Sequence, residues 1–176
     1  MAQAAAETAL RNNGNGRSAE KSGKYLAFFL GAEEFGIEVM RVREIIGIQE
    51  VTAVPHTPEY VRGVINLRGK VIPVLDLRSK LGLPQMEETQ CSCIMVVQLE
   101  SSTGSMLTGV VVDGVSEVLT ISAGDIEPAP DFGQDVRVHH VLGIAKVRGK
   151  VKILLDINQI LSTDETQAMS QVMGVN

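Results

Sequence analysis

The chain of 176 residues contains nearly the same segment twice, and this duplication limits the folds that it can adopt. Residues 62–77 read RGVINLRGKVIPVLDL, and residues 142–157 read LGIAKVRGKVKILLDI. The copies share Arg-Gly-Lys-Val and a Leu-Asp pair, and most other positions exchange one apolar residue for another. Solenoid repeats recur every roughly 20–50 residues. The two copies begin at residues 62 and 142, which is a longer spacing. The sequence therefore predicts two similar halves, each containing a small β unit.

Each copy predicts a β-hairpin followed by a short helix. In the first copy, one apolar run ends at Arg68-Gly69 and a second apolar run follows at once. Glycine at this junction provides the positive φ that a tight hairpin turn requires. Asp76 then precedes a short helical pattern, and Asp156 takes the same place in the second copy. We expect both aspartates to cap these helices, because a carboxylate accepts hydrogen bonds from first-turn N–H groups.

A weaker similarity precedes each copy. The segment FGIEVMRVREII resembles TGVVVDGVSEVL, with Val42 aligned to Val115 and Glu44 aligned to Glu117. Both segments alternate apolar and polar residues over part of their length, which predicts half-buried strands. The duplication therefore extends beyond the hairpins.

The pattern of strands predicts an all-β fold. Many short strands with turn signals every 8–12 residues or so indicate an antiparallel barrel or sandwich. The long crossovers that a parallel sheet would need are missing. We expect two small β-barrels in tandem, related by a pseudo-twofold axis and packed around a shared core, with a C-terminal helix. Pro73 cannot donate to a β-ladder, so its strand is expected at an edge or a bulge.

The composition along the chain predicts a single folded region with two tails. Residues 1–23 are rich in Ala, Asn and Gly, which indicates a disordered tail. Residues 24–162 form the expected two-barrel domain, with the polar, proline-containing segment 82–90 as the linker between its halves. Residues 163–176 are expected to form a polar helical tail.

The charge of the chain argues against nucleic acid as a partner. The formal net charge is −5, and no stripe of Lys and Arg is present. Non-specific binding to nucleic acid depends on such clustered positive charge.

No apolar run approaches the roughly 20 residues of a membrane span, and the first residues do not resemble a secretory signal. We expect a cytoplasmic location.

The sequence contains no constellation that predicts catalysis, a cofactor or a metal site. No P-loop and no G-x-S-x-G motif occurs. Cys91 and Cys93 are too few for a four-ligand zinc cluster. The adjacent His139 and His140 would point to opposite faces of a strand. We therefore expect no catalytic residue, no cofactor and no metal.

One enzymatic alternative stays open. Asp76 and Asp156 occupy equivalent places in the two halves, as the paired aspartates of a two-lobed aspartic hydrolase do. The small hydroxyl residue and the glycine that follow such aspartates are absent, because Leu77 and Ile157 come next. Helix capping explains both carboxylates without chemistry.

The order of the segments resembles the family of CheW-like bacterial chemotaxis coupling proteins. The resemblance covers roughly residues 24–162 and depends most on the pattern P-x-T-P-x-x-x-x-G-V-x-N-L-R-G, which begins at Pro55. It implies two five-stranded, SH3-like β-barrels and an adaptor without catalysis. It also implies two partners, which are the regulatory domain of the histidine kinase CheA and the cytoplasmic tip of transmembrane chemoreceptors. The membrane would be reached only indirectly, through the receptors.

The resemblance further implies a set of protein-binding residues. Glu44 and Arg68 match the paired charges of the family, and the other matching positions are Val42, Gly63, Val115 and Val118. An exposed valine on an edge strand can dock against another sheet, and a glycine leaves room for close backbone approach. The valines can equally be ordinary core residues, and Arg68 a solvated turn residue.

A relative with a different partner is the remaining alternative. The CheV type joins this kind of domain to a phosphorylatable receiver domain. The residues after 162 are too few for a receiver domain. We therefore expect the stand-alone type.

Overall fold

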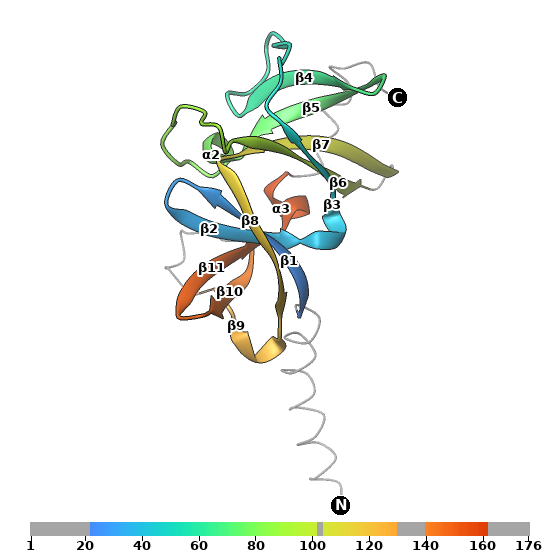
Figure 1. Ribbon diagram of the computed structural model, residues 1–176. Helices are drawn as coiled ribbons and strands as arrows, with labels where there is room; N and C mark the ends of the chain where they lie inside the picture. Colours follow the sequence, from blue (N-terminus) through green and yellow to red (C-terminus); the bar gives the residue numbers. More distant parts are fainter. Residues whose placement is uncertain (1–21, 102–103, 130–139, 162–176) are drawn as a thin grey trace, which may run out of the picture.

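The strands of the protein form two sheets. The computed structural model describes residues 22–101, 104–129 and 140–161 (Figure 1). In chain order the elements are β1 (Gly23–Leu30), β2 (Glu33–Glu38), η1 (Val39–Arg41), β3 (Val42–Gly47), β4 (Val61–Leu67), β5 (Lys70–Asp76), α2 (Leu77–Lys80), β6 (Cys93–Ser101), β7 (Gly104–Val112), β8 (Gly114–Ile121), η2 (Ala123–Asp125), β9 (Ile126–Glu127), β10 (Val141–Val147), β11 (Lys150–Leu155) and α3 (Ile157–Ile160).

The predicted mainly β fold is confirmed. A six-stranded sheet has the order β8-β1-β2-β11-β10-β9, and a five-stranded sheet has the order β3-β6-β7-β5-β4. Most neighbouring strands are antiparallel, but β2 pairs with β11 and β5 with β7 in parallel. The backbone pairing leaves both sheets open. Among the described residues, β8 and β9 are the edges of one sheet, and β3 and β4 are the edges of the other.

The two sheets exchange strands between the two halves of the sequence. The hairpin β1-β2 lies in the sheet that holds β8, β10 and β11, whereas the hairpin β6-β7 lies with β3, β4 and β5. The segment 82–90 therefore connects α2 and β6, which belong to the same side of the molecule, and it does not separate two barrels as predicted. Each of these two hairpins therefore pairs with strands from the other half of the sequence. The local sequence pattern does not specify which strands pair.

The repeated hairpin-and-helix unit is confirmed at both positions. The Asp76 carboxylate accepts from the N–H groups of Arg78 at 3.0 Å and Ser79 at 3.4 Å. The Asp156 carboxylate accepts from the N–H of Asn158 at 3.1 Å. Both helices α2 and α3 are therefore capped by the aspartate that precedes them.

Each hairpin turn places an arginine as well as a glycine at positive φ. Arg68 and Gly69 have φ values of 51° and 86°, and Arg148 and Gly149 have values of 53° and 77°. Two consecutive residues with positive φ are typical of the type I′ turn, whose twist matches that of the flanking strands. The arginine therefore occupies a conformation that is uncommon for residues with a side chain.

The position of Pro73 differs from the prediction. Strand β5 is not an edge strand, because it lies between β4 and β7. The pairing of β5 with β7 begins at Val74, one residue after the proline. The missing N–H of Pro73 is tolerated at this point, since the parallel ladder has not yet started.

A shared core joins the two sheets. The largest buried cluster contains Phe28 and Ile37 from the six-stranded sheet and Met95, Val97 and Val110 from the five-stranded sheet. In Figure 1 the helix α3 lies between the two sheets. Each sheet also has a smaller apolar cluster of its own. Each sheet therefore has apolar side chains buried on both faces, which is consistent with a curled, barrel-like shape.

The predicted tails fall almost entirely outside the described residues. Of residues 1–23, only Ser22 and Gly23 are described, and Gly23 begins β1. Residues 163–176 are not described. In the described ranges, no helix combines the length and the hydropathy that a membrane crossing requires.

Candidate protein-binding site

The predicted pair of charges meets at one end of the five-stranded sheet. Glu44 lies on edge strand β3, and Arg68 lies at the tip of the β4-β5 hairpin. The Nη1 of Arg68 donates to Oε2 of Glu44 at 3.1 Å, and Nη2 donates to the other carboxylate oxygen. Since β3 and β4 are opposite edges of this sheet, the ion pair joins the two edges. The hydrogen bonds and the negative charge of Glu44 also raise the pKa of Arg68.

The six-stranded sheet contains the equivalent pair. Glu117 lies on edge strand β8, and Arg148 lies at the tip of the β10-β11 hairpin. The Nη1 of Arg148 lies 3.5 Å from Oε1 of Glu117. The duplicated sequence has therefore produced an equivalent ion pair in each sheet, although in the six-stranded sheet Arg148 lies beside the edge strand β9 and not at the edge itself.

Exposed apolar side chains accompany both ion pairs at equivalent positions. Ile45 follows Glu44 on β3 as Val118 follows Glu117 on β8, and Val71 follows one hairpin turn as Val151 follows the other. Their exposed fractions are 45% for Ile45, 48% for Val71, 53% for Val118 and 56% for Val151. We call Glu44, Ile45, Arg68 and Val71 the first rim, and Glu117, Val118, Arg148 and Val151 the second rim. Among the described residues, these four are among the six large apolar side chains that are most exposed.

The predicted valines divide into two kinds. Val118 is exposed on β8. Val42 and Val115 are half-buried, and both pack against the shared core. The structure therefore joins Glu44 with Arg68, and it places Val42 and Val115 against the same core from strands of different sheets.

Gly63 has a clear role inside the protein. It is buried in β4 with a φ of 141°, and a Cβ atom there would lie 2.0 Å from the carbonyl oxygen of Thr52. Thr52 and Val64 exchange two backbone hydrogen bonds of 2.9 Å beside this glycine. The close approach that Gly63 permits is therefore intramolecular.

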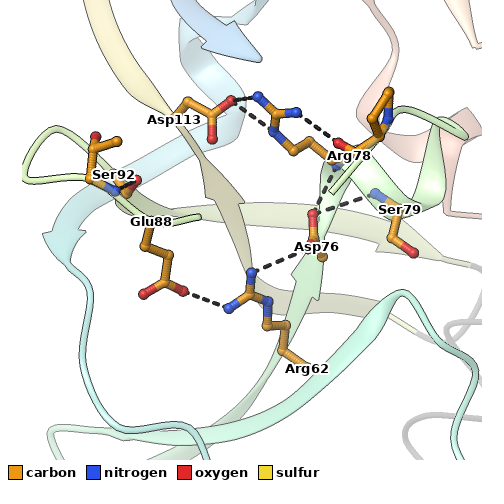
Figure 2. Close-up of polar contacts among 9 residues, drawn as sticks. Arg62, Asp76, Arg78, Ser79, Glu88, Ser92 and Asp113 are labelled. Atoms are coloured by element: carbon orange, nitrogen blue, oxygen red, sulfur yellow. Dashed lines mark hydrogen bonds and ion pairs between the residues drawn. The ribbon is translucent and has the colours of Figure 1, made fainter. Parts of the chain in front are cut away.

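Sequence reasoning missed a polar network beside the five-stranded sheet (Figure 2). Arg62 lies 3.2 Å from Asp76 and 2.5 Å from Glu88. Asp76 in turn caps the helix that carries Arg78, and the Arg78 guanidinium pairs with Asp113. Partial burial alone would lower the pKa of Arg62, but hydrogen bonds to Glu88 and Asp76 raise it overall.

One sequence signal would have indicated part of this network. The two copies of the repeat differ at the second residue after the capping aspartate, which is Arg78 in the first and Asn158 in the second. A charged residue at a position where the other copy is uncharged suggests a partner that is present on one side only. The partner itself, Asp113, is 35 residues away along the chain, and no local pattern connects the two.

A cavity of about 580 Å3 lies beside Asp113. Its walls are formed by Phe29, Gly31, Met86, Glu87, Thr89, Cys91, Cys93, Asp113, Gly114 and Val115. Burial, and then the nearby Cys91 thiol, raise the pKa of Cys93. In the described part of the chain, no three His, Cys, Asp or Glu side chains are grouped as metal ligands. A largely apolar recess therefore lies beside Val115.

Comparison with known proteins decides the family. The model of the CheW-like domain matches residues 24–165, which is most of the chain. The chain belongs to the CheW-like domain family. The predicted family is therefore confirmed, and the two ion pairs belong to a CheW-like protein.

Relatives of known name support the same assignment. The chemotaxis protein CheW of Klebsiella aerogenes is 36% identical, over 85% of this chain and 87% of its own length. The chemotaxis protein CheW of Rhizobium meliloti is 38% identical, over 81% of this chain and 90% of its own. The crystal structure of the scaffolding protein TtCheW from Thermoanaerobacter tengcongensis is similar at a TM-score of 0.72 and 32% identity, covering 82% of this chain and 95% of that one. This CheW-like protein is a chemotaxis adaptor.

Proposed function

We propose that this CheW-like adaptor binds two signalling proteins at the same time and performs no reaction itself. The partners are the regulatory domain of the histidine kinase CheA and the cytoplasmic tip of a chemoreceptor. The adaptor would work in the cytoplasm and reach the membrane through the receptor. The family assignment and the scaffolding role named for the similar crystal structure support this proposal.

The presence of two equivalent rims supports binding of more than one partner. The first rim belongs to the five-stranded sheet and the second rim to the six-stranded sheet. Each combines an ion pair with two exposed apolar side chains. A single binding function would need one such surface, whereas an adaptor needs two.

The edge strands offer a physical mode of docking. Within the described residues, β3 pairs with β6 alone and β8 pairs with β1 alone. A free strand edge can pair with a strand of another sheet, and side chains beside it then select the partner. We assign two roles at the first rim, which are contact with the partner and support of the contacting residues, to Val42, Glu44, Gly63 and Arg68. At the second rim, the same roles belong to Val115 and Val118.

The two aspartates of the enzymatic alternative are used structurally. Asp76 caps α2 and pairs with Arg62, and Asp156 caps α3. Both carboxylates are therefore occupied by partners within the fold, which supports a non-catalytic adaptor.

Charge reversal at the rims tests the proposal. The variant Arg68→Glu places two negative charges together at the first rim, and Arg148→Glu does the same at the second. We expect each variant to weaken one partner by at least about tenfold, because like charges at an interface oppose binding. The measurements are the affinities for purified CheA regulatory domain and for a receptor-tip fragment, and kinase activity with membrane-embedded receptor.

A matched control restores the pair with its charges exchanged. The double variant Glu44→Arg with Arg68→Glu can form the ion pair again in the opposite direction. If the ion pair only holds the sheet edges together, this double variant restores binding. If the partner contacts the charged side chains directly, binding stays weak. Failure of the unaltered protein to bind either partner at micromolar concentration would overturn the proposal.

A further inference from the structure

Asp113 occupies the point where the chain passes from one sheet to the other. Strand β7 of the five-stranded sheet ends at Val112, and strand β8 of the six-stranded sheet begins at Gly114. The N–H of Asp113 donates to the carbonyl of Phe29 at 2.9 Å. Its carboxylate Oδ2 accepts from the N–H of Gly31 at 2.6 Å. Asp113 is therefore fixed to the β1-β2 hairpin of the six-stranded sheet.

Arg78 holds the same carboxylate from the other side. It lies on α2, directly after β5 of the five-stranded sheet. Its Nε donates to Oδ2 of Asp113 at 2.8 Å, its Nη2 donates to the same oxygen, and its Nη1 donates to the carbonyl of Pro84 at 2.8 Å (Figure 2). The side chains of Arg78 and Asp113 are only 7% and 22% exposed. The Arg78–Asp113 pair thus joins the two sheets through a largely buried, directional contact.

The pseudo-symmetry of the molecule is broken at this contact. The chain crosses between sheets a second time, from β2 through η1 to β3. The residue there that is equivalent to Asp113 is Met40, which is 87% exposed, and the residue equivalent to Arg78 is Asn158. Neither can form an ion pair. A largely buried ion pair therefore joins the sheets at one crossing only. At the other crossing, Arg41 of η1 lies 3.9 Å from Glu100 in a more exposed pair, and the Asn158 amide accepts a hydrogen bond of 3.0 Å from the N–H of Glu100.

The apolar core between the sheets cannot replace this contact. Burial of apolar surface is favourable but non-directional, so packed apolar faces can slide or rotate with little change in buried area. An arginine that donates several hydrogen bonds in its fixed planar fork constrains orientation as well as distance. Buried ion pairs in proteins contribute more to a specific arrangement than to stability in several systems.

We propose that Arg78 and Asp113 are positioning residues that fix the orientation of the two sheets and thereby couple binding at one rim to binding at the other. This inference rests on the proposed function, because it requires two partners on one molecule. A partner that shifts one sheet would, through this contact, shift the rim of the other sheet. Without the contact, each rim would bind its partner independently.

The first experiment measures orientation without any partner. Cys91 and Cys93 are replaced by Ser, and spin labels are attached at Lys70→Cys and Lys150→Cys, which are exposed equivalent positions on β5 and β11. Pulsed electron paramagnetic resonance then gives the distribution of distances between the two sheets. We expect a narrow distribution in this background.

The test variant removes both charges together. Arg78→Met with Asp113→Asn leaves no unpaired buried charge, and the Asn side-chain oxygen can still accept from the N–H of Gly31. Replacement of both partners of a buried pair is tolerated far better than removal of one. We expect a distribution at least about twofold broader than in the parent. If the double variant does not fold, Arg78→Lys serves in its place, because it keeps the charge but lacks the planar fork.

The control is Glu88→Gln, which removes a charge of the same network without touching the contact between the sheets. We expect its distribution to match the parent. An unchanged distribution in the double variant, or equal broadening in both variants, would overturn the positioning role.

The second experiment measures coupling. The affinity for the CheA regulatory domain is measured with and without a saturating receptor-tip fragment, and the ratio is the coupling factor; such factors are roughly 5- to 150-fold in coupled systems. We expect each partner alone to bind the double variant within about twofold of the parent, while the coupling factor falls to near 1. An unchanged coupling factor would overturn the inference, as would equal loss of both single affinities. Absence of partner binding to the parent would refute the proposed function alone, because the distance measurement does not depend on it.

Discussion

The two rims have the same sequence origin but differ in how firmly they are built. In the first rim, Arg68 donates two hydrogen bonds to Glu44. In the second, the corresponding atoms of Arg148 and Glu117 lie 3.5 Å apart. The acidic side chain is also less exposed in the first rim, at 28% against 39%. A bidentate arginine–carboxylate pair has a defined geometry, whereas a single exposed contact does not.

The same difference extends to the elements that support each rim. The Asp76 carboxylate has three donors, from two backbone N–H groups and Arg62, while Asp156 has one hydrogen bond from a backbone N–H. The first rim therefore stands on a more constrained unit. We infer that the five-stranded sheet provides a rigid docking surface and that the six-stranded sheet provides a more adaptable one. Two comparisons between equivalent positions, and one test at alkaline pH, can break or sharpen this view.

Substitution of the two equivalent hairpin glycines should have the largest effect on the free energy of unfolding. A Cβ at Gly63 would lie 2.0 Å from a backbone carbonyl oxygen, whereas at Gly143 the nearest atoms are a side-chain carbon of Ile126 at 2.8 Å and the oxygen of Glu127 at 2.9 Å. Gly63 also has a φ of 141°. We expect Gly63→Ala to reduce the free energy of unfolding by more than about 3 kcal/mol and Gly143→Ala by about 1–2 kcal/mol.

Urea unfolding followed by circular dichroism measures both glycine variants. The slope of the free energy against urea should stay constant if only the folded state is affected. Equal losses in the two variants would contradict the view that the first unit is the more constrained.

Substitution of the two capping aspartates should reveal a smaller difference in stability between the two units. Asp76→Ala removes a helix cap and a partner of Arg62, so we expect a loss of about 2–3 kcal/mol. Asp156→Ala removes a cap alone, which costs about 1 kcal/mol. The variants Asp76→Asn and Asp156→Asn keep an oxygen acceptor for the cap. Thermal and urea unfolding of all four separate the two contributions, since only the first Asn variant also loses an ion pair.

The smallest effect is expected at Tyr25 of the six-stranded sheet, and only at alkaline pH. Burial, and then the negative charge of Glu38, raise the pKa of Tyr25 in the six-stranded sheet from 10.0 to about 12. The folded state therefore keeps this phenol protonated where the unfolded chain releases the proton. The resulting stability is complete below pH 10 and is lost as the pH rises toward about 12.

We expect Tyr25→Phe to flatten the decline of stability between about pH 10 and pH 12. Urea unfolding of the parent and of this variant at a series of alkaline pH values checks the expectation. An identical pH dependence in Tyr25→Phe and the parent would show that the phenol does not titrate differently on folding.

Several features of the fold could be predicted because they depend on neighbours in sequence. The hairpin turns at Arg68 and Arg148 follow from adjacent residues, and the caps at Asp76 and Asp156 act within three positions. The family pattern that begins at Pro55 is likewise continuous in the sequence. Repetition of the unit then predicted a duplicated β protein, and the structure confirms it.

Other features required the tertiary structure. The exchange of the β1-β2 and β6-β7 hairpins between the sheets depends on which strand edges and apolar faces match across the whole molecule. Pairing of Arg78 with Asp113 joins residues 35 positions apart, and pairing of Arg68 with Glu44 joins residues 24 apart. Local patterns report propensity and periodicity, but contacts of this range are selected by the packing of both sheets together.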